Sequence, residues 1–126
     1  MKNTFSKQER LCGKKYIDEL YEKGKVFQIS PLRITILKHN YNTIAPVMIL
    51  AAVPKSLFKN AHERNLLKRR IKEAYRLNKG LLLNHTENFG SKYFLSFRYS
   101  SKNIEPYSVI EKSIQKVLIK INQQTD

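Results

Sequence analysis

The segment between residues 59 and 79 constrains the fold of this chain most strongly, because it joins a helical repeat of apolar side chains to an excess of positive charge. Buried-type residues recur every three or four positions, the spacing of one side of an α-helix. The residues expected on that side are Leu67, Ile71, Ala74, Tyr75 and Asn78. The segment also contains eight basic and two acidic residues, a net charge of +6. We therefore expect a helix with one buried side and one strongly positive side.

A basic stripe follows the buried side around the predicted helix, at about 100° of rotation per residue. Its members are Asn65, Lys68, Arg69, Lys72, Arg76 and Lys79. Glu63 and Glu73 do not lie in the middle of the stripe, so the charges do not alternate as they do on a solvated helix. Cations at this spacing match nucleic-acid phosphates, and their binding releases condensed counterions. Two alternatives stay open: a basic face that contacts nothing, and a membrane-surface helix, which the lack of bulky apolar residues at the end of the buried side disfavours.

The whole chain of 126 residues has 24 Lys and Arg against 10 Asp and Glu, a formal net charge of +14. A small domain with this charge repels itself unless a polyanion neutralises it, which favours nucleic acid or an anionic membrane surface as the partner. A highly charged soluble protein without such a partner is the alternative. Because 41% of the residues are hydrophobic and no repeat or low-complexity linker occurs, we expect residues 1–126 to form one globular domain.

The longest apolar run, Ile44–Val53, is ten residues long and has Pro46 and Pro54 at or near its ends. It is too short to cross a bilayer, and the N-terminus lacks the apolar block of a signal peptide. Cys12 is the single cysteine, so neither an internal disulfide nor a cysteine-based metal site can form. We therefore expect a cytoplasmic protein in a reducing environment, with no membrane partner.

The remaining periodicity predicts an α+β domain with one sheet and helices packed on it. One helix is expected over Lys14–Lys23, with Gly24 as a left-handed C-terminal cap, and a last helix is expected to begin near Pro106. The nearly continuous apolar run Ile44–Val53 is typical of a central strand, and we expect it to form an antiparallel hairpin with the strand before it. The expected strands are Lys25–Ile29, Leu32–Lys38, Ile44–Val53 and Lys92–Tyr99.

The basic helix contains three short motifs in a fixed order: Arg64-Asn65, then Lys68-Arg69, then Ile-Lys-Glu-Ala-Tyr-Arg over residues 71–76. This order resembles the signature helix of the bacterial ribonuclease P protein component. The resemblance covers nearly the whole chain, including the motifs Arg10-Leu11, Leu20-Tyr21-Glu22-Lys23-Gly24 and Val53-Pro54-Lys55. The chain departs from the family pattern in two places. Leu66 stands where the family has a second arginine, and Phe58-Lys59-Asn60-Ala61 stands where the family often has a turn of small residues and Gly before the helix. We expect Arg70, four residues after Leu66, to replace that arginine in space.

The resemblance implies a single-sheet α-β sandwich of element order αβββαβα, a ribosomal protein S5 domain 2-like fold with a left-handed βαβ crossover. It implies that the protein is a subunit of the ribonucleoprotein ribonuclease P, an RNA-based endoribonuclease that removes the 5′ leader of precursor tRNA. The implied partners are the catalytic ribonuclease P RNA and precursor tRNA, and the protein itself is expected to be monomeric. The implied cofactor is Mg²⁺, held mainly by the RNA.

By the same resemblance, the signature helix and the loop before it bind the catalytic RNA. The residues implied are Lys55, Arg64, Asn65, Lys68, Arg69, Arg70, Lys72 and Arg76. Arg64 lies near the buried side of the predicted helix, so a role in anchoring the helix stays open for it. A cleft between the first helix and the sheet is implied to bind the single-stranded leader, through Ile17, Tyr21, Arg33 and Thr35. The alternative for Tyr21 is a core residue with its hydroxyl at the surface.

No residue pattern indicates a catalytic site or a metal site in the protein itself. His39, His62 and His85 are far apart in the chain without metal-ligand spacing, and we expect each of them at the surface. No cluster of Asp and Glu suggests a two-metal nuclease. The cleavage chemistry is therefore expected to belong to the RNA, while the protein contributes electrostatics and positioning.

Three other classes of protein share some of these features. A ribosomal or other structured-RNA-binding protein without a role in cleavage is the main alternative, although such proteins usually carry long basic tails. A helix-turn-helix DNA-binding protein needs a short helix directly before the recognition helix, where a strand is expected here. A stand-alone metal nuclease needs ligands that the sequence does not group together.

Overall fold

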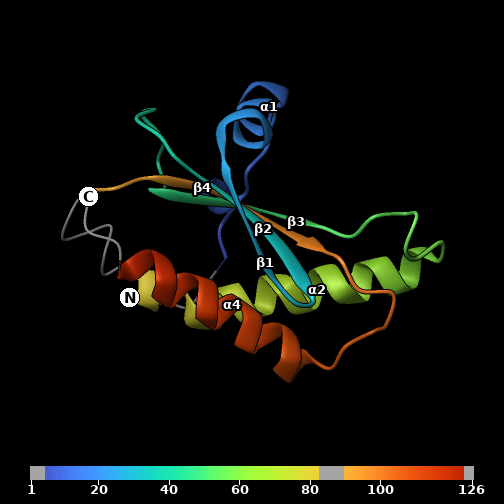
Figure 1. Cartoon of the computed structure of the whole chain (residues 1–126). Helices are drawn as coiled ribbons and strands as arrows, with labels where there is room; N and C mark the ends of the chain where they lie inside the picture. The colour runs from blue at the N-terminus through green and yellow to red at the C-terminus, as the bar shows by residue number, and fades with distance from the viewer. Residues whose placement is uncertain (1–4, 83–89, 124–126) are drawn as a thin grey trace.

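The computed structural model describes residues 5–82 and 90–123 of the chain. A four-stranded sheet in the order β1-β2-β4-β3 has α1 on one face and both α2 and α4 on the other (Figure 1). The strands are β1 (Lys25–Ile29), β2 (Leu32–Lys38), β3 (Val47–Ala52) and β4 (Tyr93–Tyr99). The helices are the 3-10 turn η1 (Lys7–Glu9), α1 (Lys14–Lys23), α2 (Ala61–Asn78) and α4 (Tyr107–Asn122). The α+β class and the expected order of helices and strands are confirmed, and the handedness of the crossover stays a prediction.

β3 lies at one edge of the sheet, so its expected central position is wrong. β4 pairs antiparallel with β2 and parallel with β3, and therefore separates the two strands that we expected to form a hairpin. The apolar run has another cause, because both faces of β3 are covered. Val47 and Ile49 pack into one core cluster, and Met48 and Leu50 pack against another. A continuous apolar strand thus indicates cover on both faces rather than a neighbour on both edges.

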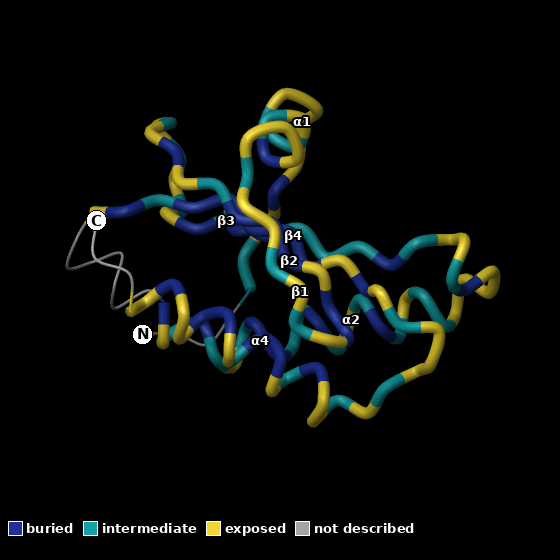
Figure 2. Tube along the Cα trace, viewed as in Figure 1, coloured by how far each residue is buried: buried dark blue, intermediate teal, exposed yellow. Residues whose placement is uncertain are grey.

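Two clusters of buried side chains hold the layers together. Figure 2 marks the buried residues in dark blue along the chain. The main core lies between the sheet and the α2–α4 pair, with Leu67 and Ile71 from α2 and Ile114 from α4 among its members. The second core, built around Leu20 and Phe94, lies on the opposite face under α1. Because α1 has a single buried residue, it covers only part of that face and leaves polar strand residues open to solvent.

The end of α1 shows why a glycine is needed at position 24. Its φ is −73°, so the expected left-handed cap is wrong. A Cβ at Gly24 would lie 2.4 Å from the carbonyl oxygen of Leu20 and 2.7 Å from Cγ2 of Thr35. Position 24 therefore requires glycine because a Cβ has no room there, since the chain passes from α1 into β1 directly against β2.

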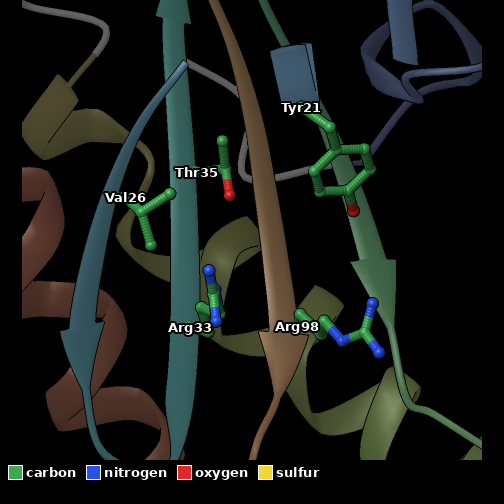
Figure 3. Close-up of a pocket in the computed structure, with 5 residues that line it drawn as sticks. All are labelled: Tyr21, Val26, Arg33, Thr35 and Arg98. Atoms are coloured by element: carbon green, nitrogen blue, oxygen red, sulfur yellow. The ribbon is translucent and has the colours of Figure 1, made fainter. Parts of the chain in front are cut away.

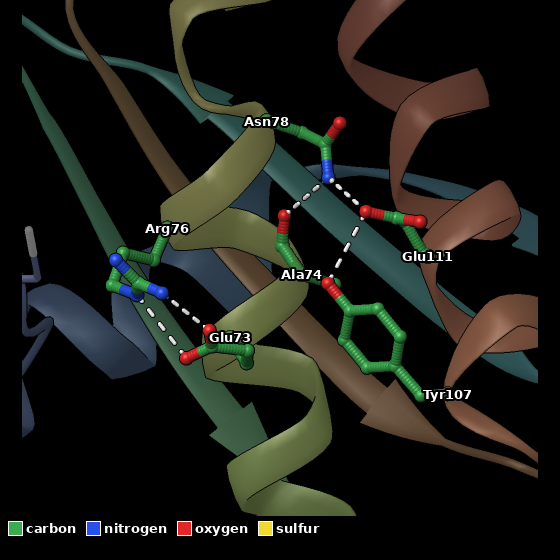
Figure 4. A network of polar contacts seen from close by, with 6 residues as sticks. All are labelled: Glu73, Ala74, Arg76, Asn78, Tyr107 and Glu111. Atoms are coloured by element: carbon green, nitrogen blue, oxygen red, sulfur yellow. Dashed lines mark hydrogen bonds and ion pairs between the residues drawn. The ribbon is translucent and has the colours of Figure 1, made fainter. Parts of the chain in front are cut away.

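The buried side predicted for α2 is confirmed at four of its five positions. Leu67, Ile71, Ala74 and Tyr75 are buried, whereas Asn78 is only half-buried and faces α4. Its amide nitrogen donates hydrogen bonds to the carbonyl oxygen of Ala74 (2.7 Å) and to Glu111 of α4 (3.0 Å) (Figure 4). At the other end of the helix, the side chain of Asn60 accepts a hydrogen bond from the backbone N–H of His62 (2.8 Å), which caps the helix. These contacts fix α2 at both ends and leave its outer side free.

Candidate nucleic-acid interface

Three cations of α2 form a row that we call the exposed cations: Lys68, Arg69 and Lys72. Arg69 and the neighbouring Asn65 are exposed, and the other two side chains are partly exposed. Within residues 5–82 and 90–123, no carboxylate forms an ion pair with any of the three. Because the opposite side of α2 is anchored in the main core, these charges are presented on a rigid element. A polyanion would therefore meet positive charge that the protein itself does not neutralise.

Arg76 continues this row but is paired within the protein. Its Nε donates to Oε2 of Glu73 at 3.1 Å, and its Nη2 donates to the other carboxylate oxygen (Figure 4). The hydrogen bond from Arg76 lowers the pKa of the Glu73 carboxyl and raises the pKa of the guanidinium. Arg76 therefore brings less net positive charge to the surface than each of the exposed cations does.

Lys79 does not belong to the basic stripe, contrary to the expectation from the helical spacing. Lys79 is only 4% exposed, and its Nζ lies 3.0 and 2.9 Å from the two carboxylate oxygens of Glu9 in η1. The spacing of residues along α2 cannot show that a segment from the start of the chain packs against the end of the helix. The buried pair instead joins η1 to α2.

Two arginines of α2 donate hydrogen bonds to backbone carbonyls. Nη1 of Arg64 donates to the carbonyl oxygens of Phe58 and of the next residue, at 2.7 and 2.8 Å. Nη1 of Arg70 donates to the carbonyl oxygen of Glu105, at 2.6 Å, in the loop before α4. Each guanidinium has further N–H groups for a phosphate. Lys55 is exposed in the turn that follows β3. The roles of all three in RNA binding stay predictions.

A second polar surface, which we call the sheet pocket, lies on the open part of the face that α1 covers. It has a volume of about 370 Å³. Figure 3 shows the side chains that line it. Its lining residues are Tyr21, Val26, Arg33, Thr35 and Arg98. Tyr21, Arg33 and Thr35 were expected at such a site, and the structure brings them together. Ile17 does not line the pocket, because it packs against the second core.

Arg98 is the functional candidate that the sequence reasoning missed. It lies directly opposite Arg33 in the antiparallel pairing of β4 with β2. Its signal in the sequence was a charged residue between two aromatic ones, Phe97 and Tyr99, and the structure shows it as the one exposed residue of β4. Like charges at directly opposed positions destabilise a sheet. The described part of the chain places no carboxylate in an ion pair with either arginine, so an anion bound in this pocket would reduce the repulsion between the two strand positions.

Tyr21 lines the sheet pocket as an exposed side chain whose hydroxyl is hydrogen-bonded to the sheet. The residue is 45% exposed, and its hydroxyl shares a 2.7 Å hydrogen bond with Oγ of Ser96 on β4. The alternative of a core tyrosine with a surface hydroxyl is therefore wrong. A ring that is fixed at one end and open to solvent is a surface on which an unpaired base can stack.

The histidines differ from one another in burial. His39 is buried, contrary to the expectation of a surface position, and its ring stacks on Phe94 with centroids 3.9 Å apart. Its Nδ1 accepts a hydrogen bond from the backbone N–H of Tyr41 at 3.1 Å. His62 is exposed as expected, and His85 lies outside the described residues.

The remaining chemistry of the described chain is limited in two respects. In residues 5–82 and 90–123, no three side chains of His, Cys, Asp or Glu lie close enough together to hold a metal ion. No helix in those ranges combines the length and apolarity that a membrane span requires.

Comparison with known proteins gives a consistent result. Residues 5–122 match the family model described as Ribonuclease P. A ribonuclease P protein component from Porphyromonas gingivalis is 34% identical over 116 residues, which are 92% of this chain and 85% of that protein. The fold is similar to that of the RNase P protein from Thermotoga maritima, with a TM-score of 0.70 and 19% identity over 90% of this chain and 97% of that one. The RNase P protein from Staphylococcus aureus gives a TM-score of 0.65 and 22% identity over 91% and 95% of the two chains.

Proposed function

Because the chain belongs to the ribonuclease P protein family, we propose that its exposed cations on α2 bind the RNA subunit of ribonuclease P. The chain is the protein component of this tRNA-processing enzyme. The observation that supports the binding surface is the row Lys68, Arg69 and Lys72, which has no carboxylate partner within the described residues. Guanidinium groups add bidentate phosphate contacts that ammonium groups cannot make.

Cleavage itself is assigned to the RNA in this proposal. Mg²⁺ is the metal that would serve it, held mainly by RNA phosphates, and the described protein residues group no acidic or histidine ligands that fit such an ion. The protein's part is electrostatic. Its cations reduce the repulsion between RNA phosphates, so that the folded RNA and the substrate need less Mg²⁺ to come together. We expect the protein to act in the cytoplasm as a monomer.

The sheet pocket is proposed to bind the single-stranded 5′ leader of precursor tRNA. Arg33 and Arg98 both line the pocket and supply cations for backbone phosphates, and a base can stack on the open ring of Tyr21. Ile17 contributes indirectly, since it packs α1 against the second core and so holds Tyr21 in place. The pocket therefore combines the two features that single-strand sites use, a cationic track and a stacking surface.

The binding of RNA and its consequence are tested together by a rescue assay. The purified full chain is added to ribonuclease P RNA at a Mg²⁺ concentration at which the RNA alone cleaves precursor tRNA poorly. We expect the protein to restore cleavage, and we expect the salt dependence of its RNA binding to be steep. A protein that binds the RNA but does not restore cleavage, while the RNA alone cleaves at high Mg²⁺, would instead fit a structured-RNA-binding protein without a role in cleavage.

The leader site has a separate test in the assembled holoenzyme. Substrates with a long leader and with a one-nucleotide leader are compared for wild type and for the double variant Arg33→Ala with Arg98→Ala. The variant should bind the long-leader substrate about tenfold more weakly, because it loses a phosphate site, and should bind the short-leader substrate as wild type does. An equal loss on both substrates would show that the arginines act on the tRNA body or on the fold.

A further inference from the structure

A second pocket, of 220 Å³, lies between α2 and the start of α4, and we call it the α2–α4 pocket. Its lining residues are Leu66, Arg69, Arg70, Glu73 and Tyr107. It shares no residue with the sheet pocket and lies on the other side of the sheet. The function proposed above makes no use of Leu66 or Tyr107.

The α2–α4 pocket borders the surface proposed for RNA. Arg69 is one of the exposed cations and also lines the pocket. Leu66 and Glu73 are two helical turns apart on the flank of α2 that lies between the exposed cations and α4. An RNA strand that follows the exposed cations therefore passes the mouth of the pocket. Leu66 is also the position where the family pattern has an arginine, and here it gives the pocket an apolar wall.

The ring of Tyr107, the aromatic residue that lines the pocket, is held in place before any ligand binds. The hydroxyl of Tyr107 donates to Oε2 of Glu111 at 3.2 Å, and the same carboxylate oxygen accepts a hydrogen bond from the amide of Asn78 at 3.0 Å (Figure 4). Burial and the neighbouring Glu111 raise the pKa of Tyr107 to about 12, so the hydroxyl keeps the proton that it donates. A fixed ring is a better stacking partner than a mobile one, because less conformational entropy is lost on binding.

The charges that line the α2–α4 pocket favour a neutral base over a phosphate inside it. The Glu73 carboxylate lines the pocket and would repel a phosphate group, although it is paired with Arg76. A neutral planar base can stack on Tyr107 and donate N–H groups to that carboxylate. Arg69 and Arg70 lie on the lining of the same pocket, where they can bind the phosphates on either side of the base. We propose that the α2–α4 pocket binds one unpaired nucleobase of the ribonuclease P RNA, an inference that rests on the function proposed above.

The test compares two pairs of matched variants for their affinity for ribonuclease P RNA over a range of salt concentrations. Tyr107→Leu removes the stacking surface, and Tyr107→Phe retains it while losing the hydrogen bond to Glu111. Leu66→Ala trims the apolar wall, and Leu77→Ala makes the same change at an exposed position of α2 outside the pocket. Thermal melting of each variant is measured in parallel.

We expect Tyr107→Leu to lower the affinity about tenfold at every salt concentration, which corresponds to ~1.4 kcal/mol, with no change in the slope of log K against log salt. Leu66→Ala should lower it about threefold, and Leu77→Ala should match wild type. Tyr107→Phe should bind more tightly than Tyr107→Leu and no more tightly than wild type, because it keeps the ring and loses only the hydrogen bond that holds it. Wild-type affinity in both Tyr107→Leu and Leu66→Ala would overturn the base pocket and leave the RNA-binding function intact. An equal loss in Leu66→Ala and Leu77→Ala would also overturn it. Failure of the wild-type protein to bind the RNA would overturn the proposed function and this inference together.

Discussion

Replacing Lys68 and Arg69 together with alanine tests whether the exposed cations contact phosphates. Neither side chain has a carboxylate partner in the described part of the chain, so their removal breaks no ion pair there. Each phosphate contact contributes about 0.9 to the slope of log K against log salt for a double-stranded target. Two lost contacts should therefore reduce the steepness of that slope by about 1.8.

This change in slope has a direct consequence for measured affinities. Between 50 and 200 mM salt, a difference of 1.8 in the slope changes the ratio of wild-type to variant affinity by about twelvefold. The variant should thus bind far more weakly than wild type at low salt, and the two should approach each other as salt rises. The measurement is a filter-binding or fluorescence titration with ribonuclease P RNA at several salt concentrations.

The control variant removes the same charge elsewhere. Lys112 and Lys116 are exposed on α4, away from the exposed cations, and their replacement by alanine lowers the net charge by the same amount. If this control changes the slope as much as the α2 variant does, binding responds to net charge and the argument for a phosphate-contacting helix fails. A large drop in melting temperature of the α2 variant would refute the reasoning in another way, because it would show that the two side chains are structural.

Two further predictions concern stability. Lys79→Met should lower the free energy of unfolding by ~3–5 kcal/mol in a urea titration, because it leaves the Glu9 carboxylate buried without its cation, and Glu9→Leu combined with Lys79→Met should recover most of that loss. A double variant as unstable as the single one would contradict this. Burial, with the nearby Lys92, lowers the pKa of His39 against an opposing effect of Glu19, so folding favours the neutral ring. The contribution of His39 to the free energy of unfolding should therefore be full above the unfolded pKa of about 6.5, and it should decline as the pH falls below that value, by up to ~1.4 kcal/mol per pH unit. The variant His39→Leu should show a flatter decline. An unchanged pH profile in that variant would exclude His39 as the source of the decline.

The features that could be predicted from the sequence are those that depend on local spacing. The buried side of α2 follows from residues three and four positions apart, and β2 matches its expected range because alternate side chains face the core. The exposed cations follow from the same helical geometry. Tyr21, Arg33 and Thr35 came from the family resemblance, and the structure places them around one pocket.

The features that could not be predicted depend on segments that are distant in the chain. Lys79 has the spacing of a surface residue, yet η1 packs over it. The apolar sequence of β3 is the same for a central strand and for an edge strand that is covered on both faces. Arg98 became a candidate only when the register placed it opposite Arg33. Each of these facts requires the pairing of segments that the local pattern does not encode.

The central place of β4 has a consequence for how the chain is made. The β1–β2 pair and the β3–α2 unit are synthesised before residue 93. Until β4 is synthesised, the edges of β2 and β3 that pair with β4 have no strand partner. Completion of the sheet waits for a strand from the last third of the chain to insert between two earlier pieces. A nascent or truncated chain that ends before β4 is therefore the form most exposed to mispairing with other chains.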